Sequence, residues 1–195
     1  MKYKAFIFDL DGTLVDSGPD LANSVNLMRK HYKLAALPIP QIVTYIGNGA
    51  AKLVERSLKD TDLCPKDGLK VFLKLYEKNI CIKTKFFDGV ENFLKELQER
   101  NIPAVVLTNK PQAMTDKLMK EMNSAHYFEY IYGPEKFGAK PDPTGLIECI
   151  KLLKLNPEDV MMVGDHTTDL NAATGAGTQS IFCHFGIYIN SINRW

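Results

Sequence analysis

The sequence lacks any apolar run long enough to span a bilayer. Only four apolar residues, Ala5-Phe6-Ile7-Phe8, precede the first acidic residue. A membrane-spanning helix needs about 20 apolar residues and a signal-peptide core about 7–15. We therefore expect a cytoplasmic protein with no membrane partner.

A dominant charge of either sign is also missing. The 24 Lys and Arg residues are balanced by 23 Asp and Glu residues, which leaves a net charge of +1. Such a chain has no overall field that would attract nucleic acid or an anionic surface. We expect no nucleic-acid partner, so any anion must bind at a local site.

Closely spaced cysteines are absent as well. The four cysteines contain no C-x-x-C pair and are Cys64, Cys81, Cys149 and Cys183. Free thiols are the expected state in a reducing cytoplasm. We predict that they serve as small buried hydrophobic residues and not as catalytic groups.

What the sequence does contain is a regular alternation of apolar runs and helical patterns. Residues 5–8 are apolar at every position, which is typical of a strand buried on both faces of a parallel sheet. From residue 87 onward, strands are predicted at 103–107, 130–132, 160–163 and 179–183, with helices at 90–100, 112–122, 144–153 and 170–174. This order predicts an α/β protein with a Rossmann-like parallel sheet and helices on both faces.

A stretch without a convincing strand separates the first strand from this alternating part. Helical spacing begins near residue 17 and returns at 50–58 and 69–79, with a break at 37–40. We interpret residues 16–83 as an inserted all-helical domain. Residues 1–15 and 84–195 then form the Rossmann-like core, and the length fits one domain with such an insert.

Polar residues stand where the predicted strands end. Asp9 and Asp11 follow the first strand, Thr108 the second and Asp165 a later one, while Lys140 lies in a loop. Open α/β sheets bind ligands at the carboxyl ends of their strands. If these strands are neighbours, the five side chains meet at one edge of the sheet.

These side chains suit phosphoryl transfer. Asp9 and Asp11 project the same way where the chain is extended, so one carboxylate could attack phosphorus while the other handles protons. Mg²⁺ suits such a site because it takes carboxylate, phosphate and water oxygens. Thr108 and Lys140 could contact phosphate oxygens, and Asp165 with Asp169 four residues later could complete a metal site.

Each signal also has an ordinary structural explanation. The stretch from Asp9 to Gly12 could be a turn or part of a calcium loop. Thr108 could cap a helix, and Lys140 could be a solvated lysine. Asp165 and Asp169 could be acids favoured by a helix dipole. The combination in this order favours the functional interpretation.

Four motifs resemble those of the haloacid dehalogenase-like hydrolase superfamily, and more narrowly its phosphoglycolate phosphatase-like branch, which has a helical cap. They are FDLDGTLVDS at 8–17, LTNK at 107–110, GAKPDP at 138–143 and VGDHTTD at 163–169. A further stretch, YIGNG at 45–49, is similar to the branch's substrate-facing cap loop. The resemblance covers nearly the whole chain.

The resemblance implies roles for the core residues. Asp9 would attack phosphorus and become the aspartyl-phosphate. Asp11 would protonate the leaving group and then deprotonate the hydrolytic water. Thr108 and Lys140 would hold the phosphoryl oxygens, and Asn109 would add a contact near the phosphate.

The resemblance also implies a Mg²⁺ cofactor. Its ligands would be Asp9, the main-chain carbonyl of Asp11, and Asp165. Asp169 would support the metal site or orient Lys140, as an outer carboxylate often does.

The all-helical insert would act as a cap domain that closes over the site. Its loop residues Gly47, Asn48 and Gly49 would contact the substrate, a small phosphorylated metabolite. Phosphoglycolate is the first expectation among such metabolites. The protein is expected to be a monomer or a homodimer.

Other interpretations stay open at this point. A dehalogenase would share Asp9 but would not need Asp11. A phosphonate hydrolase would need a cap lysine, for which Lys52 is a loose candidate better explained as a solvated helix lysine. A sugar-phosphate mutase would use the same core residues, whereas a non-catalytic phosphate-binding module would be signalled by loss of either aspartate.

Two remaining features need an interpretation. His166 lies between two aspartates, but Mg²⁺ has little use for imidazole, so we interpret it as a loop histidine. After residue 186 the family usually continues with a further strand and helix, whereas this sequence ends at Trp195.

Overall fold

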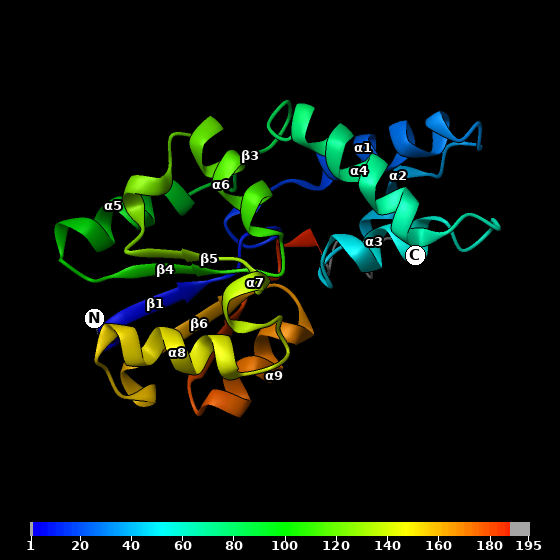
Figure 1. The fold of residues 1–195 in the computed structure, drawn as a ribbon. Coiled ribbons are helices and arrows are strands. Elements are labelled where there is room, and N and C mark those ends of the chain that lie inside the picture. The colour runs from blue at the N-terminus through cyan, green and yellow to red at the C-terminus, as the bar shows by residue number, and fades with distance from the viewer. Residues whose placement is uncertain (1, 188–195) are drawn as a thin grey trace.

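A computed structural model describes residues 2–187 of the chain, and a five-stranded parallel sheet forms its centre (Figure 1). The strands are β1 Ala5–Phe8, β4 Ala104–Leu107, β5 Tyr130–Tyr132, β6 Val160–Gly164 and β7 Gln179–Phe182. They lie in the order β5-β4-β1-β6-β7, and each neighbouring pair is parallel. The predicted α/β, Rossmann-like architecture is confirmed.

Helices cover both faces of this sheet. They are α5 Val90–Glu99, α6 Gln112–Glu121, α7 Pro134–Phe137, α8 Thr144–Leu153 and α9 Thr167–Ala176. Figure 1 shows α5 and α6 on one face and α8 and α9 on the other. Because successive strand residues point to opposite faces, Phe6 and Phe8 join one buried cluster and Ile7 joins the other. The apolar run of β1 is thus buried on both sides.

Four further helices lie between β2 (Val15–Asp16) and β3 (Lys85–Phe86), two short strands that pair antiparallel. The helices are α1 Gly18–His31, α2 Ile39–Val43, α3 Ala50–Ser57 and α4 Pro65–Lys78. In Figure 1 this helical segment lies beyond the end of the sheet toward which β1 points. It therefore stands over the edge where the predicted site residues are placed.

Asp20 anchors the point where the helical segment returns to the core. One carboxylate oxygen accepts backbone N–H bonds from Ile82, Lys83 and Thr84 at 2.9, 2.8 and 2.8 Å. The Thr84 hydroxyl adds a fourth bond at 2.8 Å. Because Asp20 is buried at the start of α1, these bonds hold both ends of the segment together.

Several elements differ from the sequence-based prediction. The break expected at 37–40 ends earlier, because α2 begins at Ile39 with Pro40 in its first turn, where the missing N–H is tolerated. The short elements β2, β3 and α7 were not predicted, and neither were the 3₁₀ turns Ala125–Tyr127 and Pro157–Asp159. Elements of two to four residues are too short to show a period.

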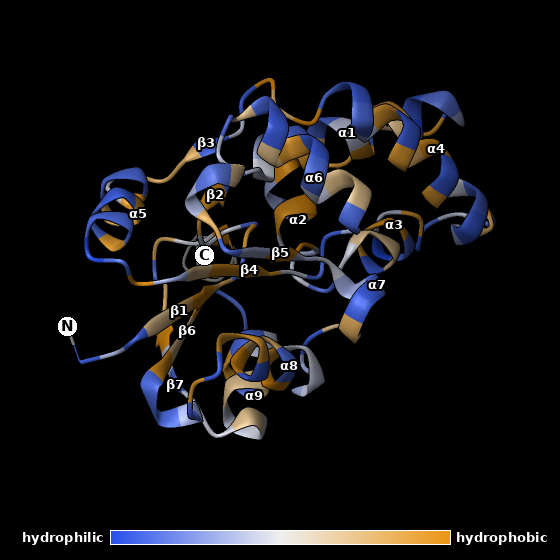
Figure 2. Ribbon diagram, turned by 60° about the vertical axis from the view of Figure 1, so that its left-hand side comes forward, coloured by the Kyte–Doolittle hydropathy of each residue, from blue (hydrophilic) through white to orange (hydrophobic). Residues whose placement is uncertain are grey.

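Hydropathy follows this architecture. Figure 2 shows the central strands β1, β4 and β6 as largely apolar, and α5 as a mixture of polar and apolar turns. All four thiols are free, as predicted, but only Cys149 and Cys183 are buried. None of the helices within 2–187 is long and apolar enough to cross a membrane. The unusual ending at 188–195 lies outside the described residues.

Candidate active site

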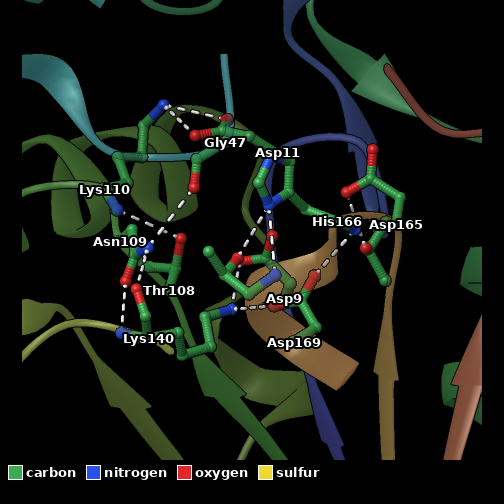
Figure 3. Close-up of polar contacts among 12 residues, drawn as sticks. Asp9, Asp11, Gly47, Thr108, Asn109, Lys110, Lys140, Asp165, His166 and Asp169 are labelled. Carbon is green, nitrogen blue, oxygen red and sulfur yellow. Dashed lines mark hydrogen bonds and ion pairs between the residues drawn. The ribbon is translucent and has the colours of Figure 1, made fainter. Parts of the chain in front are cut away.

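The predicted polar residues stand at the carboxyl ends of the central strands (Figure 3). Asp9 directly follows β1, Thr108 follows β4 and Asp165 follows β6. The sheet continues one hydrogen bond further, since Asp9 N donates to Val163 O at 2.9 Å and Thr108 N donates to Tyr132 O at 3.0 Å. These two residues are therefore held by sheet hydrogen bonds and not by a loose loop.

Lys140 reaches the same edge from the loop between α7 and α8. Its ammonium lies 2.8 Å from Asp9 Oδ1 and 2.6 Å from Asp169 Oδ1, and its side chain is 3% exposed. Burial alone would lower the pKa of Lys140, but the carboxylates of Asp169 and Asp9 outweigh burial and raise it. Burial raises the pKa of Asp9 to about 6, although Lys140 opposes that shift. The site thus places the protonated Lys140 ammonium beside the buried carboxyl group of Asp9.

Asn109 fixes the position of Lys140. Its side-chain oxygen accepts a bond from Lys140 N at 2.8 Å, and its amide nitrogen donates to Lys140 O at 2.9 Å. The same amide donates to Gly47 O of the helical segment at 3.3 Å. Gly49 lies close as well, because a Cβ on it would come 3.0 Å from Asn109 O. Asn109 therefore links the core to the 47–49 loop.

Asp169 has two structural partners. One oxygen faces Lys140, and the other accepts a bond from His166 N at 3.0 Å. His166 is the N-cap of α9, and its Nδ1 accepts the N–H of Thr168 at 3.2 Å. Burial lowers the pKa of His166, which favours the neutral ring that can accept this bond. The predicted loop histidine thus has a capping role that fixes Asp169.

Asp165 lies against backbone that only glycine allows. Gly12 has φ +91°, and a Cβ on it would lie 2.2 Å from Asp165 Oδ2. A Cβ on Gly186 would likewise come 2.2 Å from Asp165 Cβ. Thr13 Oγ1 donates to Asp165 Oδ1 at 3.4 Å. The glycine that follows Asp11 therefore lets the loop after β1 approach the carboxylate closely.

Three buried carboxylates could hold a metal ion. Asp9, Asp165 and Asp169 offer oxygen atoms that lie within 4.8 Å of one another. Asp9 Oδ1 and Asp169 Oδ1 contact Lys140 as ion pairs but accept no hydrogen bond of good geometry from the described residues. Lone pairs of an all-oxygen donor set therefore remain for a hard cation, and the residues fit such an ion.

Lys110 and Tyr76 are site residues to which sequence reasoning gave no role. The Lys110 ammonium lies 3.0 and 3.1 Å from the two carboxylate oxygens of Asp11 and 2.6 Å from the Tyr76 hydroxyl. Ser17 Oγ donates to Asp11 Oδ1 at 2.6 Å. Burial alone would lower the pKa of Lys110, but Asp11 and Tyr76 outweigh it and raise it. The motif at 107–110 was the one available signal for Lys110, whereas Tyr76 looked like an ordinary apolar position of a helix.

A small pocket of about 40 Å³ lies between the core and the helical segment. Its lining includes Asp9, Asp11, Thr108, Asn109, Lys110, Gly47, Gly49 and Tyr76. Asn48 is not part of this lining, and its side-chain oxygen instead accepts a bond from Arg56 at 2.8 Å. Arg56 also donates to Tyr45 O at 2.9 Å, so it braces the 47–49 loop from behind. Lys52 is exposed and pairs with Glu55, as expected of a solvated lysine.

The fold and this carboxylate-rich edge define a hydrolase of the α/β class, and the sequence identifies which family. The chain belongs to the haloacid dehalogenase-like hydrolase family, whose pattern matches residues 6–183. The motifs at 8–17, 107–110, 138–143 and 163–169 all lie within that match. The family predicted from these motifs is confirmed.

Relatives within the family carry the name phosphoglycolate phosphatase. The enzyme of Chromobacterium violaceum is 36% identical over 94% of this chain and 86% of its own length. That of Nitrosospira multiformis is 35% identical over 92% of this chain and 82% of its own length. A crystal structure from Haemophilus somnus, described as a predicted phosphoglycolate phosphatase, superposes with a TM-score of 0.91 at 29% identity. This superposition covers 95% of the present chain and 87% of the Haemophilus somnus chain.

Proposed function

We propose that this hydrolase is a Mg²⁺-dependent phosphatase that cleaves a small phosphomonoester, phosphoglycolate first, through an aspartyl-phosphate on Asp9. The observation that carries the proposal is the buried Asp9 carboxylate, which follows the central strand and lies 2.8 Å from the Lys140 ammonium. A carboxylate nucleophile beside a fixed cation is the arrangement that phosphoryl transfer to a side chain needs.

The proposal assigns each chemical step to a residue. Lys140 and Thr108 bind the phosphoryl oxygens while an oxygen of Asp9 attacks phosphorus. The bond to the leaving oxygen breaks, and Asp11 gives that oxygen a proton. Water then attacks phosphorus of the aspartyl-phosphate while Asp11 takes a proton from the water. The bond between Asp9 and phosphorus breaks, which releases phosphate and regenerates the Asp9 carboxylate.

The ligands proposed for Mg²⁺ are Asp9, the main-chain carbonyl of Asp11, and Asp165. Asp169 supports the metal site from the edge and orients Lys140, with which it pairs at 2.6 Å. When bound, the ion neutralises charge on the phosphoryl oxygens during transfer. The three clustered carboxylates support this assignment.

Residues 16–83 serve as the cap in this proposal, and 1–15 with 84–195 serve as the catalytic core. The bond from Asn109 to Gly47 O and the pocket between the two parts support a cap that closes on the site. The names of the relatives support phosphoglycolate as the substrate. We further propose a cytoplasmic enzyme, monomeric or homodimeric, that acts on a small metabolite and not on nucleic acid.

The test is phosphate release from a panel of small phosphomonoesters, with Mg²⁺ and with a chelator. Asp9→Asn removes the nucleophile and changes few contacts, so we expect it to abolish turnover. Asp67→Asn is the matched control, because Asp67 lies on α4 with a side chain that is 63% exposed.

Turnover that needs Mg²⁺, is lost in Asp9→Asn and survives in Asp67→Asn would support the proposal, and phosphoglycolate should rank first in the panel. Turnover that persists in Asp9→Asn would refute the covalent mechanism. A folded wild type that binds Mg²⁺ but releases no phosphate would favour a sugar-phosphate mutase or a non-catalytic module.

A further inference from the structure

Lys110 is a buried cation to which the proposed reaction assigns no step. Of the described residues that line the pocket, only Lys110 carries a positive charge. Its side chain is 3% exposed, and it arises from the same loop after β4 as Thr108. Figure 3 shows that it reaches toward Asp11, whereas Lys140 reaches toward Asp9. The two lysines therefore stand at different parts of the site.

The position of Lys110 marks the leaving-group side. In the proposed reaction Asp9 attacks phosphorus, while Asp11 protonates the leaving oxygen. The Lys110 ammonium is 3.0 Å from Asp11, so it lies next to the atoms that the leaving group brings. Lys140 is the cation that would bind the phosphoryl oxygens. Lys110 is therefore left to bind a second anion of the substrate, which the leaving group would carry.

Tyr76 adds a hydrogen-bond donor at the same place. Its hydroxyl oxygen accepts from Lys110 at 2.6 Å, and the described residues give the hydroxyl hydrogen no acceptor. The side chain is 1% exposed and lines the pocket from α4 of the helical segment. An anion near Lys110 would therefore receive a bond from the core and a second one from the helical segment.

We propose that Lys110 and Tyr76 form a subsite for a carboxylate carried by the leaving group of the substrate. This inference rests on the proposed phosphatase function and deepens it. The three N–H donors of the Lys110 ammonium face the two oxygens of Asp11 and the Tyr76 hydroxyl. A substrate carboxylate would therefore take one of the two donors that Asp11 holds, and Asp11 would keep the other. Substrates with this second anion are selected over neutral phosphomonoesters of the same size.

The subsite also limits the length of the leaving group. A carboxyl group separated from the leaving oxygen by one carbon has its oxygens roughly 3 Å from that oxygen, given ordinary bond lengths of about 1.5 Å. That reach matches an ammonium placed one hydrogen bond beyond Asp11. The pocket is small, at about 40 Å³, which favours a leaving group of a few atoms over a nucleoside.

The test measures binding separately from turnover. Calorimetry in the presence of Mg²⁺ compares 3-phosphonopropionate, in which a CH₂ replaces the leaving oxygen of phosphoglycolate, with propylphosphonate, which lacks the carboxylate. We expect the wild type to bind 3-phosphonopropionate about ten- to a hundredfold more tightly, as a charge-assisted contact allows. In Lys110→Met this preference should fall to about threefold or less.

Two further variants keep the test independent of misfolding. Lys110→Arg retains the charge and should retain most of the preference. Tyr76→Phe removes one hydroxyl from a buried ring and should reduce the preference severalfold while the melting temperature stays within a few degrees. A similar loss of affinity for both phosphonates would show that Lys110 acts only through Asp11, and would overturn the inference.

Failure of the inference can be told apart from failure of the proposed function. A wild type that releases phosphate from phosphoglycolate but binds both phosphonates equally would retain the phosphatase assignment and refute the carboxylate subsite. A wild type that prefers 3-phosphonopropionate in a Lys110-dependent way but releases no phosphate would retain the subsite and refute the phosphatase assignment.

Discussion

Asp9→Asn should make the metal-free protein more stable at neutral pH, even though it should abolish activity. Burial raises the pKa of Asp9 from 3.8 to about 6, so the folded state binds a proton more tightly than the unfolded state does. Stability therefore falls as the pH rises through this window, because the unfolded chain loses its proton first. Asparagine resembles the protonated acid and does not have this cost.

The magnitude follows from the shift. A difference of about two pKa units corresponds to roughly 3 kcal/mol of destabilisation, fully present above about pH 7 and absent below about pH 3. The advantage of Asp9→Asn over the wild type should therefore grow by about 2 kcal/mol between about pH 4.5 and about pH 7.5. Urea unfolding in a chelating buffer at these two pH values measures it, with exposed Asp67→Asn as the control.

Parallel pH profiles for wild type and Asp9→Asn would refute this reasoning. They would mean that Lys140 compensates the buried carboxylate fully, and that Asp9 is ionised in the folded protein at the same pH as in the unfolded chain. A profile for Asp67→Asn that departs from the wild type would instead point to a general charge effect.

Three other predictions follow from contacts in the site. Adding Mg²⁺ should raise the melting temperature of the wild type by several degrees and leave that of Asp165→Asn nearly unchanged, since an ion bound only by the folded state stabilises it. Scanning fluorimetry with and without Mg²⁺ measures this. An equal rise in both proteins would show that Asp165 is not a ligand. Gly12→Ala should lower the free energy of unfolding by about 2 kcal/mol or more and remove most of the activity, because its Cβ would lie 2.2 Å from the Asp165 carboxylate and its φ is +91°. Urea unfolding and turnover assays measure both effects. A variant with wild-type stability and turnover would show that the loop can move aside. Arg56→Met should raise KM several-fold with a smaller change in kcat, because it removes the bonds to Asn48 and Tyr45 O behind the 47–49 loop. Steady-state kinetics measures both constants. A fall in kcat with an unchanged KM would contradict this prediction.

Long elements with a clear period, and short runs rich in apolar and aromatic residues, were predictable from the sequence. Thr144–Leu153 and Tyr130–Tyr132 have the bounds that their patterns predicted. The four-residue β1 was recognisable because burial on both faces requires apolar residues at every position. The β2–β3 pair was not, since two-residue strands are defined by their partner and not by their own pattern.

The meeting of the predicted side chains at one edge of the sheet was predictable, and their individual contacts less so. Asp9 and Lys140 were expected at one edge, and their side chains do meet there at 2.8 Å. Asn48 was expected to contact the substrate with its neighbours Gly47 and Gly49, and the sequence did not predict that its side chain bonds to Arg56. A side chain in a glycine-containing loop can point either way, and the direction depends on a partner elsewhere in the chain.

Motif order, strand ends and residue chemistry are local properties, so the amino-acid sequence alone was enough to assign the α/β class and the family. It was also enough to predict which carboxylates and which lysine meet at one edge of the sheet. The contact between Lys110 and Tyr76 joins residues 34 positions apart, one in the core and one in an inserted helix. The raised pKa of Asp9 likewise depends on burial and on neighbours from distant parts of the chain, Lys140 in a loop and Asp169 in α9. Distances, burial and electrostatic environment are set by long-range packing, and therefore only the folded chain determines which anion Lys110 faces and how strongly Asp9 holds its proton.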